Sequence, residues 1–236
     1  MGEKLLEVQA LHAYYGESHI LHGVSLAVVE GEAVCLLGRN GMGKTTLLRS
    51  IMGLTTVPSG SVRFRGQGIT ALTTFQRARR GIAFVPENRE IFPDLTVGEN
   101  LQVATTLRPA QDRAIPAAVY EYFPILRERR KQRGGSLSGG EQQMLAIARG
   151  LVPEPALLLI DEFSEGLQPS IVQAISAVIR EVNRRGAAVV LVEQNIRLAL
   201  ALTARCYVLE KGQVIFEGAS ERLRADPALL QRHLAV

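Results

Sequence analysis

The sequence predicts an α/β protein with a mostly parallel sheet, and two kinds of segment carry this prediction. Short apolar runs at Ala33–Leu37, Ala156–Ile160 and Val189–Val192 lack polar alternation, which is typical of parallel strands buried on both faces. Helical patterns lie between them. The clearest opens at Pro169, keeps its apolar side chains on one stripe and ends at Gly186. Strands that alternate with helices in this way imply a parallel sheet.

Two further regions accompany this core. In the first third of the chain, Leu5–Leu11, Ile20–Val29 and Ser61–Arg65 have β-like patterns separated by turns, so we expect an N-terminal antiparallel β subdomain. Ile82–Val85 repeats the buried-strand pattern. From about residue 100 to 150, apolar residues recur at helical spacing and prolines interrupt them. This segment is expected to be an α-helical lobe inserted in the α/β core.

The composition is that of a globular protein, which we expect to form one domain over residues 1–236. Hydrophobic residues make up 47% and charged residues 21%, which argues against disorder. No apolar run approaches the roughly 20 residues that cross a bilayer, and no signal peptide is visible. We therefore expect a chain made and kept in the cytoplasm. The net charge of +4 fits nucleic acid, phosphate ligands or an anionic membrane surface equally well.

A glycine-rich motif, Gly38-x-x-x-x-Gly43-Lys44-Thr45, follows a buried strand and opens the predicted helix Lys44–Met52. Its glycines let backbone N–H groups curl around phosphate oxygens, and the start of the helix adds a positive dipole end. Lys44 is expected to reach the β- and γ-phosphates, and the Thr45 hydroxyl to hold Mg²⁺. The sequence therefore predicts a nucleotide and Mg²⁺ site made by Gly38, Arg39, Asn40, Gly41, Met42, Gly43, Lys44, Thr45 and Thr46.

Two carboxylates follow the predicted strand Ala156–Ile160. Because ligands of open α/β sheets bind at the carboxyl ends of the strands, Asp161 and Glu162 are expected beside the nucleotide. Asp161 suits the Mg²⁺ shell, and Glu162 suits the polarisation of an attacking water as a general base. These residues favour ATP hydrolysis. A nucleotide-binding regulator without turnover is the alternative that they disfavour.

A second glycine-rich motif, Leu137-Ser138-Gly139-Gly140-Glu141-Gln142-Gln143, opens a predicted helix over Gly140–Arg149 and offers another anion cradle. The chain thus has two such cradles but only one P-loop, the motif Gly38–Thr45. This suggests that each cradle completes a site on a neighbouring molecule. Here the chain resembles the ATP-binding-cassette (ABC) ATPases, whose signature motif reads Leu-Ser-Gly-Gly-x-Gln, over nearly its whole length. The resemblance implies a head-to-tail dimer that encloses two ATP molecules. Each P-loop would then face the partner's copy of the signature residues Ser138, Gly139, Gly140 and Glu141.

The resemblance also implies roles for three residues outside these motifs. Tyr15 matches the aromatic residue that stacks on adenine, with Tyr14 as the competing candidate and core packing as the alternative. Glu87 stands where the family commonly has a glutamine and can still approach Mg²⁺. Gln194 stands where most members have a histidine. It can donate a hydrogen bond to the γ-phosphate but carries no proton or charge, so hydrolysis is expected to depend chiefly on Glu162.

Three segments, Val85–Leu101, Ser164–Leu167 and Leu191–Asn195, resemble the ATPase subunits of bacterial branched-chain amino acid importers. The resemblance implies a peripheral subunit at the cytoplasmic face of the cell membrane. Its partners would be a second, different ATPase subunit, two membrane permease subunits and, indirectly, a periplasmic binding protein. Importers of urea or short amides remain an alternative. A nucleic-acid-associated ABC ATPase is disfavoured, because the chain has one set of motifs and only a compact lobe between P-loop and signature, so no nucleic-acid partner is expected.

Overall fold

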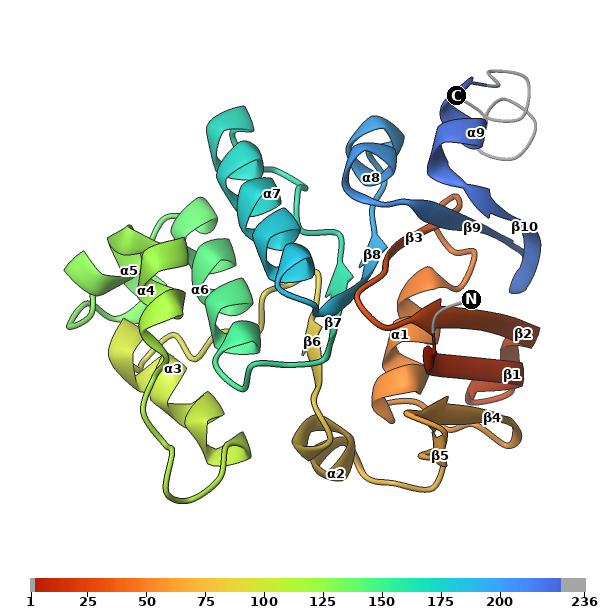
Figure 1. Cartoon of the computed structure of the whole chain (residues 1–236), viewed down its shortest axis with the longest axis horizontal. Helices are drawn as coiled ribbons and strands as arrows, with labels where there is room; N and C mark the ends of the chain where they lie inside the picture. The colour runs from red at the N-terminus through yellow and green to blue at the C-terminus, as the bar shows by residue number, and fades with distance from the viewer. Residues whose placement is uncertain (1–2, 226–236) are drawn as a thin grey trace.

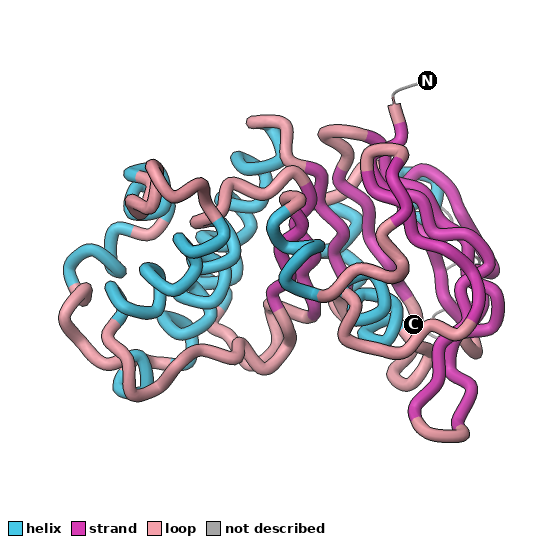
Figure 2. The backbone as a smooth tube through the Cα atoms, turned by 90° about the horizontal axis from the view of Figure 1, so that it is seen from below, coloured by secondary structure: helices cyan, strands magenta, loops and turns pink. Residues whose placement is uncertain are grey.

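The computed structural model describes residues 3–225, which form a sheet-rich core and a helical lobe beside it (Figure 1). Figure 2 shows the strands of the core gathered at one end of the molecule and the helices of the lobe at the other. Residues 1–2 and 226–236 of the predicted domain, His233 among them, lie outside the described residues. No helix within residues 3–225 is long and apolar enough to span a bilayer.

The core is a six-stranded sheet. Its strands are β3 (Ala33–Leu37), β6 (Ile82–Val85), β7 (Leu157–Asp161), β8 (Ala188–Val192), β9 (Arg205–Glu210) and β10 (Gln213–Ala219). They follow the spatial order β10-β9-β3-β8-β7-β6, and all pairs are parallel except the edge pair of β10 with β9. Every residue of β3, β7 and β8 is buried, as expected for strands covered on both faces. The predicted mostly parallel sheet is confirmed.

A second, antiparallel sheet is built from the first third of the chain. It contains β1 (Lys4–Tyr15), β2 (Ser18–Val29), β4 (Ser59–Phe64) and β5 (Gln67–Gly68), in the order β2-β1-β4-β5. The predicted antiparallel subdomain is confirmed. β1 and β2 extend beyond their predicted limits because their pairing continues to the hairpin turn, where Tyr15 pairs with Ser18. Apolar side chains of this sheet pack with α1 (Lys44–Met52) against one face of the six-stranded sheet.

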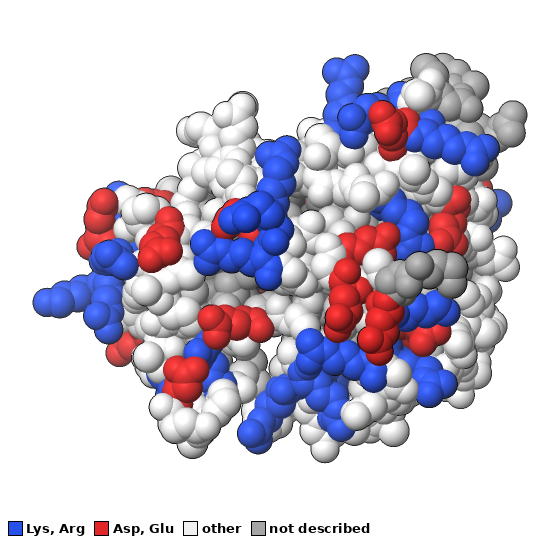
Figure 3. All heavy atoms as spheres, in the orientation of Figure 1, with Lys and Arg blue, Asp and Glu red and all other residues white. Residues whose placement is uncertain are grey.

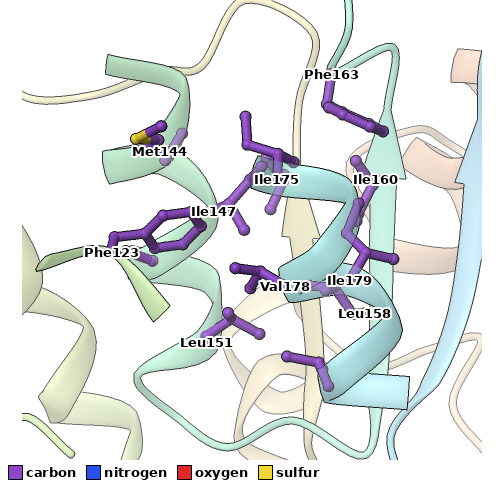
Figure 4. Packing of buried hydrophobic residues seen from close by; sticks show 14 of the residues in the cluster. Phe123, Met144, Ile147, Leu151, Leu158, Ile160, Phe163, Ile175, Val178 and Ile179 are labelled. Atoms are coloured by element: carbon purple, nitrogen blue, oxygen red, sulfur yellow. The ribbon is translucent and has the colours of Figure 1, made fainter. Parts of the chain in front are cut away.

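The helical lobe contains α3 (Val97–Ala104), α4 (Ala117–Tyr122), α5 (Pro124–Glu128) and α6 (Gly139–Leu151). Helix α7 (Pro169–Arg184) joins this lobe to the sheet (Figure 4). Three groups of apolar side chains make the junction. They are Phe123, Ile147 and Leu151 of the lobe, Ile175, Val178 and Ile179 of α7, and Leu158 and Ile160 of β7. Lobe and sheet therefore share one hydrophobic cluster.

Three shorter helices cover the rest of the core. They are α2 (Thr74–Arg79), which packs on β6, α8 (Ile196–Leu202), which packs on β3, and α9 (Ser220–Ala225), which packs on β9 and β10. No helix or strand was predicted in the region of α2 or after residue 195. The unpredicted elements include β9 and β10, whose edge hairpin completes the core sheet.

A buried arginine fixes the end of α1, the helix that starts at the P-loop. The Arg77 side chain is only 2% exposed, and its guanidinium donates to four backbone carbonyls: Ser50 at 2.8 Å, Ile51 at 2.7 Å, Leu72 at 3.0 Å and Thr70 at 2.6 Å. Two of these carbonyls belong to the last turn of α1, where a positive charge also complements the helix dipole. Arg77 thus ties α1 to the segment that leads into α2.

We expect Arg77→Met to lower the free energy of unfolding by about 3 kcal/mol, because it leaves buried carbonyls without donors. Urea denaturation followed by circular dichroism measures the change. Arg80→Met, at an exposed neighbouring position, should change it by less than about 0.5 kcal/mol. Equal effects of the two substitutions would show that the buried hydrogen bonds contribute nothing.

Candidate functional site

The P-loop connects β3 to α1 at the carboxyl edge of the parallel sheet. Two of its glycines are required by close packing. A Cβ on Gly38, whose φ is +148°, would lie 2.4 Å from the Leu209 carbonyl oxygen, and one on Gly43, at φ +102°, would lie 2.8 Å from a methyl group of Leu21. Gly43 precedes α1 and supplies no side-chain cap. The first N–H groups of α1 are therefore available to an anion.

Lys44 is held over this loop although its side chain is almost fully buried. Its ammonium group donates to the carbonyl oxygens of Gly38 at 2.8 Å and Arg39 at 3.1 Å, and it lies 3.7 Å from a carboxylate oxygen of Glu162. The positive charge thus stands between the P-loop and the end of β7. A phosphate bound to the loop would meet this charge directly.

Glu162 and Gln194 come together across the ends of β7 and β8. The Gln194 amide donates to a Glu162 carboxylate oxygen at 2.5 Å. Glu162 takes a left-handed backbone conformation, with φ +46°, and its N–H donates to the Val192 carbonyl. A hydrogen bond from Gln194 to the γ-phosphate stays a prediction. In the described structure the Gln194 amide restrains the proposed general base.

Most of the predicted nucleotide residues line one cavity of about 410 Å³. Its walls are Ile20, Asn40, Gly41, Gly43, Lys44, Thr45, Thr46, Glu87, Glu162 and Gln194. An adjoining cavity of about 480 Å³ is lined by Gly38, Arg39, Asn40, Met42, Glu193, Gln194 and Ile196. Neither cavity includes Tyr15, which is half exposed at the end of β1, or any of the signature residues 138–141. The chain therefore brings the P-loop together with the carboxylates of Glu87 and Glu162. It does not bring Tyr15 or its own signature residues to the same space.

Asp161 has the environment expected of a metal ligand. Its side chain is fully buried, and neither carboxylate oxygen meets hydrogen-bond geometry with any described group. Burial raises the pKa of Asp161 to about 6, while the nearby Thr45 hydroxyl and the Lys44 charge oppose the rise. A buried carboxylate without a donor is costly unless a cation approaches it. Asp161 and Thr45 therefore fit a hard divalent cation such as Mg²⁺.

Three further carboxylates stand around the same space. Ligand oxygens of Glu87, Glu162 and Glu165 all lie within 4.8 Å of one another. Partial burial, followed by the charges of Glu162 and Glu165, raises the pKa of Glu87. The predicted proximity of Glu87 to a metal thus has a geometric basis. Glu165 was not predicted as a site residue, because its position depends on the course of the loop after β7 rather than on the strand itself.

Glu193 supports the loop that carries Glu165. It is almost fully buried, and its carboxylate accepts hydrogen bonds from the Ser164 N–H at 3.0 Å and the Ser164 hydroxyl at 2.7 Å. Burial raises the pKa of Glu193, and the bonds from Ser164 lower it in part. No role was predicted for this residue. Its place directly after a buried strand, at the same sheet edge as Asp161, could have identified it.

The signature motif lies at the start of α6. The Ser138 hydroxyl accepts from the Glu141 N–H at 3.3 Å, and the Glu141 carboxylate accepts from the Ser138 N–H at 2.8 Å, which forms a capping box. The box starts the helix at Gly139, one residue before the predicted limit. Gly140 packs against α7, where a Cβ would lie 3.2 Å from Ile171. The motif is therefore an ordered helix start away from this chain's own nucleotide cavity.

We expect Asp161→Asn to raise the free energy of unfolding of the nucleotide-free chain at pH 8 by about 1–3 kcal/mol, because it removes a charge whose burial outweighs the effects of the nearby Thr45 hydroxyl and Lys44. The penalty on the native protein is present above a pH of about 6, where Asp161 is ionised. It should shrink as the pH falls towards 4.

Urea denaturation over this pH range measures the difference. Asp161→Asn should also lose the additional stabilisation that Mg²⁺ gives in the presence of ATP, whereas Asp94→Asn, at an exposed position, should keep it. A variant less stable than the original protein at pH 8, with the Mg²⁺ effect intact, would contradict the assignment of Asp161 as a metal ligand.

Comparison with known proteins places the chain in a family. A family model described as ABC transporter matches residues 21–165. The chain is 43% identical to the high-affinity branched-chain amino acid transport ATP-binding protein BraG of Pseudomonas aeruginosa, over 98% of this chain and 99% of that protein. It is 38% identical to the probable branched-chain amino acid transport ATP-binding protein LivF of Archaeoglobus fulgidus, over 93% and 94%. It is 34% identical to the lipopolysaccharide export system ATP-binding protein LptB of Haemophilus influenzae, over 98% and 97%.

A solved structure shares the fold. A dimeric ATP-binding cassette in a post-hydrolysis state, bound to ADP and phosphate, superposes with a TM-score of 0.82 at 26% identity, over 91% of this chain and 98% of that one. The family match extends over more than half of the chain and includes β3, the P-loop, the signature and β7 with Asp161 and Glu162. The chain therefore belongs to the ABC transporter family, as an ATP-hydrolysing subunit.

Proposed function

We propose that this chain powers an importer of branched-chain amino acids by binding and hydrolysing ATP between two ATPase subunits. One observation carries the proposal: the cavity at the P-loop contains the charges needed for hydrolysis but none of the signature residues 138–141. A second subunit that supplies its own signature motif would complete the site. The dimeric cassette with ADP and phosphate is a precedent for such pairing in a protein of the same fold.

The proposed chemistry assigns a task to each group of the cavity. The P-loop N–H groups and the start of α1 bind the phosphates, and Lys44 exchanges its two carbonyl acceptors for phosphate oxygens. Mg²⁺, held by Thr45 and Asp161 with Glu87 nearby, would neutralise phosphate charge. Glu162 accepts a proton from the attacking water, and Gln194 fixes the direction of its carboxylate.

Arg89 connects the loop that carries Glu87 to α6, the helix that begins at the signature motif. Arg89 and Glu90 both have left-handed backbones, with φ +65° and +46°, just after Glu87. The Arg89 guanidinium donates to side-chain oxygens of Gln142 and Gln143 in α6, each at 3.2 Å. Arg149 of α6 in turn donates to the Glu90 carbonyl at 2.7 Å. A movement of the Glu87 loop on nucleotide binding would therefore be transmitted to the helix that carries the signature.

An apolar groove beside this loop is the proposed docking surface for a membrane subunit. It has a volume of about 550 Å³ and lies between α2 and β6 of the core and α3 and α6 of the lobe. Four of the large apolar side chains exposed within residues 3–225 line it: Leu54, Phe75, Phe92 and Val103. Exposed apolar patches of this kind mark interaction sites. Pro86 and Glu90 also line the groove, so a bound subunit would contact the Glu87 loop.

The substrate assignment rests on similarity. Identity is higher to the two branched-chain amino acid transport proteins, at 43% and 38%, than to the lipopolysaccharide export protein, at 34%. A different second ATPase subunit, two permease subunits and a periplasmic binding protein complete the proposed assembly, with this chain at the cytoplasmic face of the membrane. On the face in Figure 3, basic residues are interspersed with acidic ones, which does not favour a nucleic-acid surface there.

Glu162→Gln should reduce kcat for ATP hydrolysis by about 10²–10⁴, because the general base is lost. ATP affinity should stay nearly unchanged, since the P-loop and Lys44 are intact. Steady-state ATPase assays of the chain with its partner subunits, together with equilibrium ATP binding, separate these effects. Glu210→Gln, at an exposed strand end elsewhere, is the matched control. If neither the original protein nor the Glu162→Gln variant turned over ATP in the full complex, a regulator without turnover would be the better interpretation.

Phe75→Asp should abolish co-purification of the chain with its membrane subunits, because it places a charge in the apolar groove. Binding of ATP to the isolated chain should not change. Ile215→Asp, at another exposed apolar position far along the chain, should leave co-purification intact. Retention of the membrane subunits by the Phe75→Asp variant would rule out this groove as their docking surface.

A further inference from the structure

Hydrogen bonds fasten the chain that follows β7 to the chain that follows β8. The Glu162 N–H donates to the Val192 carbonyl at 2.9 Å, and the Gln194 amide donates to the Glu162 carboxylate at 2.5 Å. Two residues after Glu162, the Ser164 N–H donates to Oε1 of Glu193 at 3.0 Å, and the Ser164 hydroxyl donates to Oε2 at 2.7 Å. The consecutive residues Glu193 and Gln194 therefore hold Ser164 and the proposed general base.

The backbone at Glu162 needs such support. Its φ of +46° lies in the left-handed region, which a residue with a side chain occupies only where the surrounding structure fixes it. The next residue, Phe163, is 1% exposed and packs in the hydrophobic cluster shared by the lobe and the sheet (Figure 4). Beyond Phe163, the bonds from Ser164 to Glu193 are the next attachment. The general base is thus held from both sides along the chain.

Glu193 makes these bonds at a cost in free energy. Its side chain is only 2% exposed, and its carboxylate has no ion-pair partner among residues 3–225. The nearby charge of Glu162 has the same sign. Burial of a charge without a counter-ion is unfavourable, and a neutral residue could follow β8 without this cost. Such exceptions are expected mainly at functional sites.

We propose that Glu193 is a positioning residue for ATP hydrolysis. Its carboxylate is engaged by Ser164 through both oxygens, so it acts through its neighbours and not on the nucleotide. Its bonds fix the chain on the far side of Glu162, and its own backbone leads into Gln194, which directs the Glu162 carboxylate. The inference rests on the proposed function, since it assigns Glu193 to the reaction that Glu162 is proposed to catalyse.

The same bonds also fix the position of a second carboxylate. Glu165 directly follows Ser164, and its ligand oxygen lies within 4.8 Å of those of Glu87 and Glu162. Like charges at this distance repel one another. The grip of Glu193 on Ser164 therefore holds the loop in place against this repulsion, and its loss would let the loop move away from the site.

Glu193→Gln should lower kcat for ATP hydrolysis by about tenfold to a hundredfold. The amide has a similar size but only one oxygen, so it cannot accept both Ser164 donors in the present geometry. Misplacement of a catalytic group by about 1 Å can cost about 10² in rate. Equilibrium affinity for ATP with Mg²⁺ should stay within about twofold, because the P-loop and Lys44 are intact. Steady-state assays of the chain with its partner subunits give kcat, and equilibrium binding gives the affinity.

Further variants separate positioning from packing. Glu193→Asp keeps two acceptor oxygens but is shorter, so it should retain more activity than Glu193→Gln if the bonds matter more than the volume. Ser164→Ala should also lower kcat, and in combination with Glu193→Gln it should add little further loss, because both changes break the same contact. Ser176→Ala removes a buried hydroxyl that bonds within α7, and kcat should stay within about twofold.

Unfolding midpoints show whether each variant is folded under the assay conditions. If Glu193→Gln does not fold, Ser164→Ala decides the question, since it removes only one hydrogen bond. An unchanged kcat in a complex that Glu162→Gln inactivates would overturn this inference and leave the proposed function intact. Equal losses of kcat and ATP affinity, or less activity in Glu193→Asp than in Glu193→Gln, would indicate packing alone and overturn it too. Absence of ATP hydrolysis by the original complex would overturn both.

Discussion

The nucleotide site depends on the close packing of the P-loop against β2 and β9. Gly38 approaches the Leu209 carbonyl and Gly43 approaches Leu21 so closely that neither position has room for a Cβ. This packing fixes where β3 ends and α1 begins. The free N–H groups at the start of α1 and the Lys44 ammonium group therefore face the same space as the carboxylates after β7.

Opposite charges balance in this space only in part. Lys44 lies near Glu162, but Asp161 has no hydrogen-bond donor among the described residues, and Glu87, Glu162 and Glu165 crowd one another. Such an arrangement costs free energy in the nucleotide-free chain, since buried carboxylates lose hydration and crowded ones repel one another. A divalent cation with a nucleotide would relieve it. The free energy of unfolding of the nucleotide-free chain is therefore lowered by the same residues that are proposed to bind its ligands.

The strands and helices with strong local patterns were predictable. Lys44–Met52 and Ile82–Val85 have the predicted bounds, because a glycine or a proline stops each of them. The limits of β1 and β2 could not be predicted from local pattern, because the strands extend to their hairpin turn through cross-strand pairing. The start of α6 at Gly139 follows from the local capping pair Ser138 and Glu141, which the prediction did not use. The hairpin of β9 and β10 turns at Lys211-Gly212, a local signal that the prediction did not use, and its edge position follows from the parallel pairing of β9 with β3.

Residues close together in the chain determined the P-loop, the carboxylate pair and the signature motif, because each of these needs only one strand end or one helix start. Contacts between distant segments decided the rest. Gln194 meets Glu162, and Glu193 meets Ser164, only because β7 and β8 are neighbours in the sheet. His12 meets His19 only because β1 and β2 pair as a hairpin. No local pattern specifies which strand ends become neighbours, since that depends on how the sheet buries its two faces.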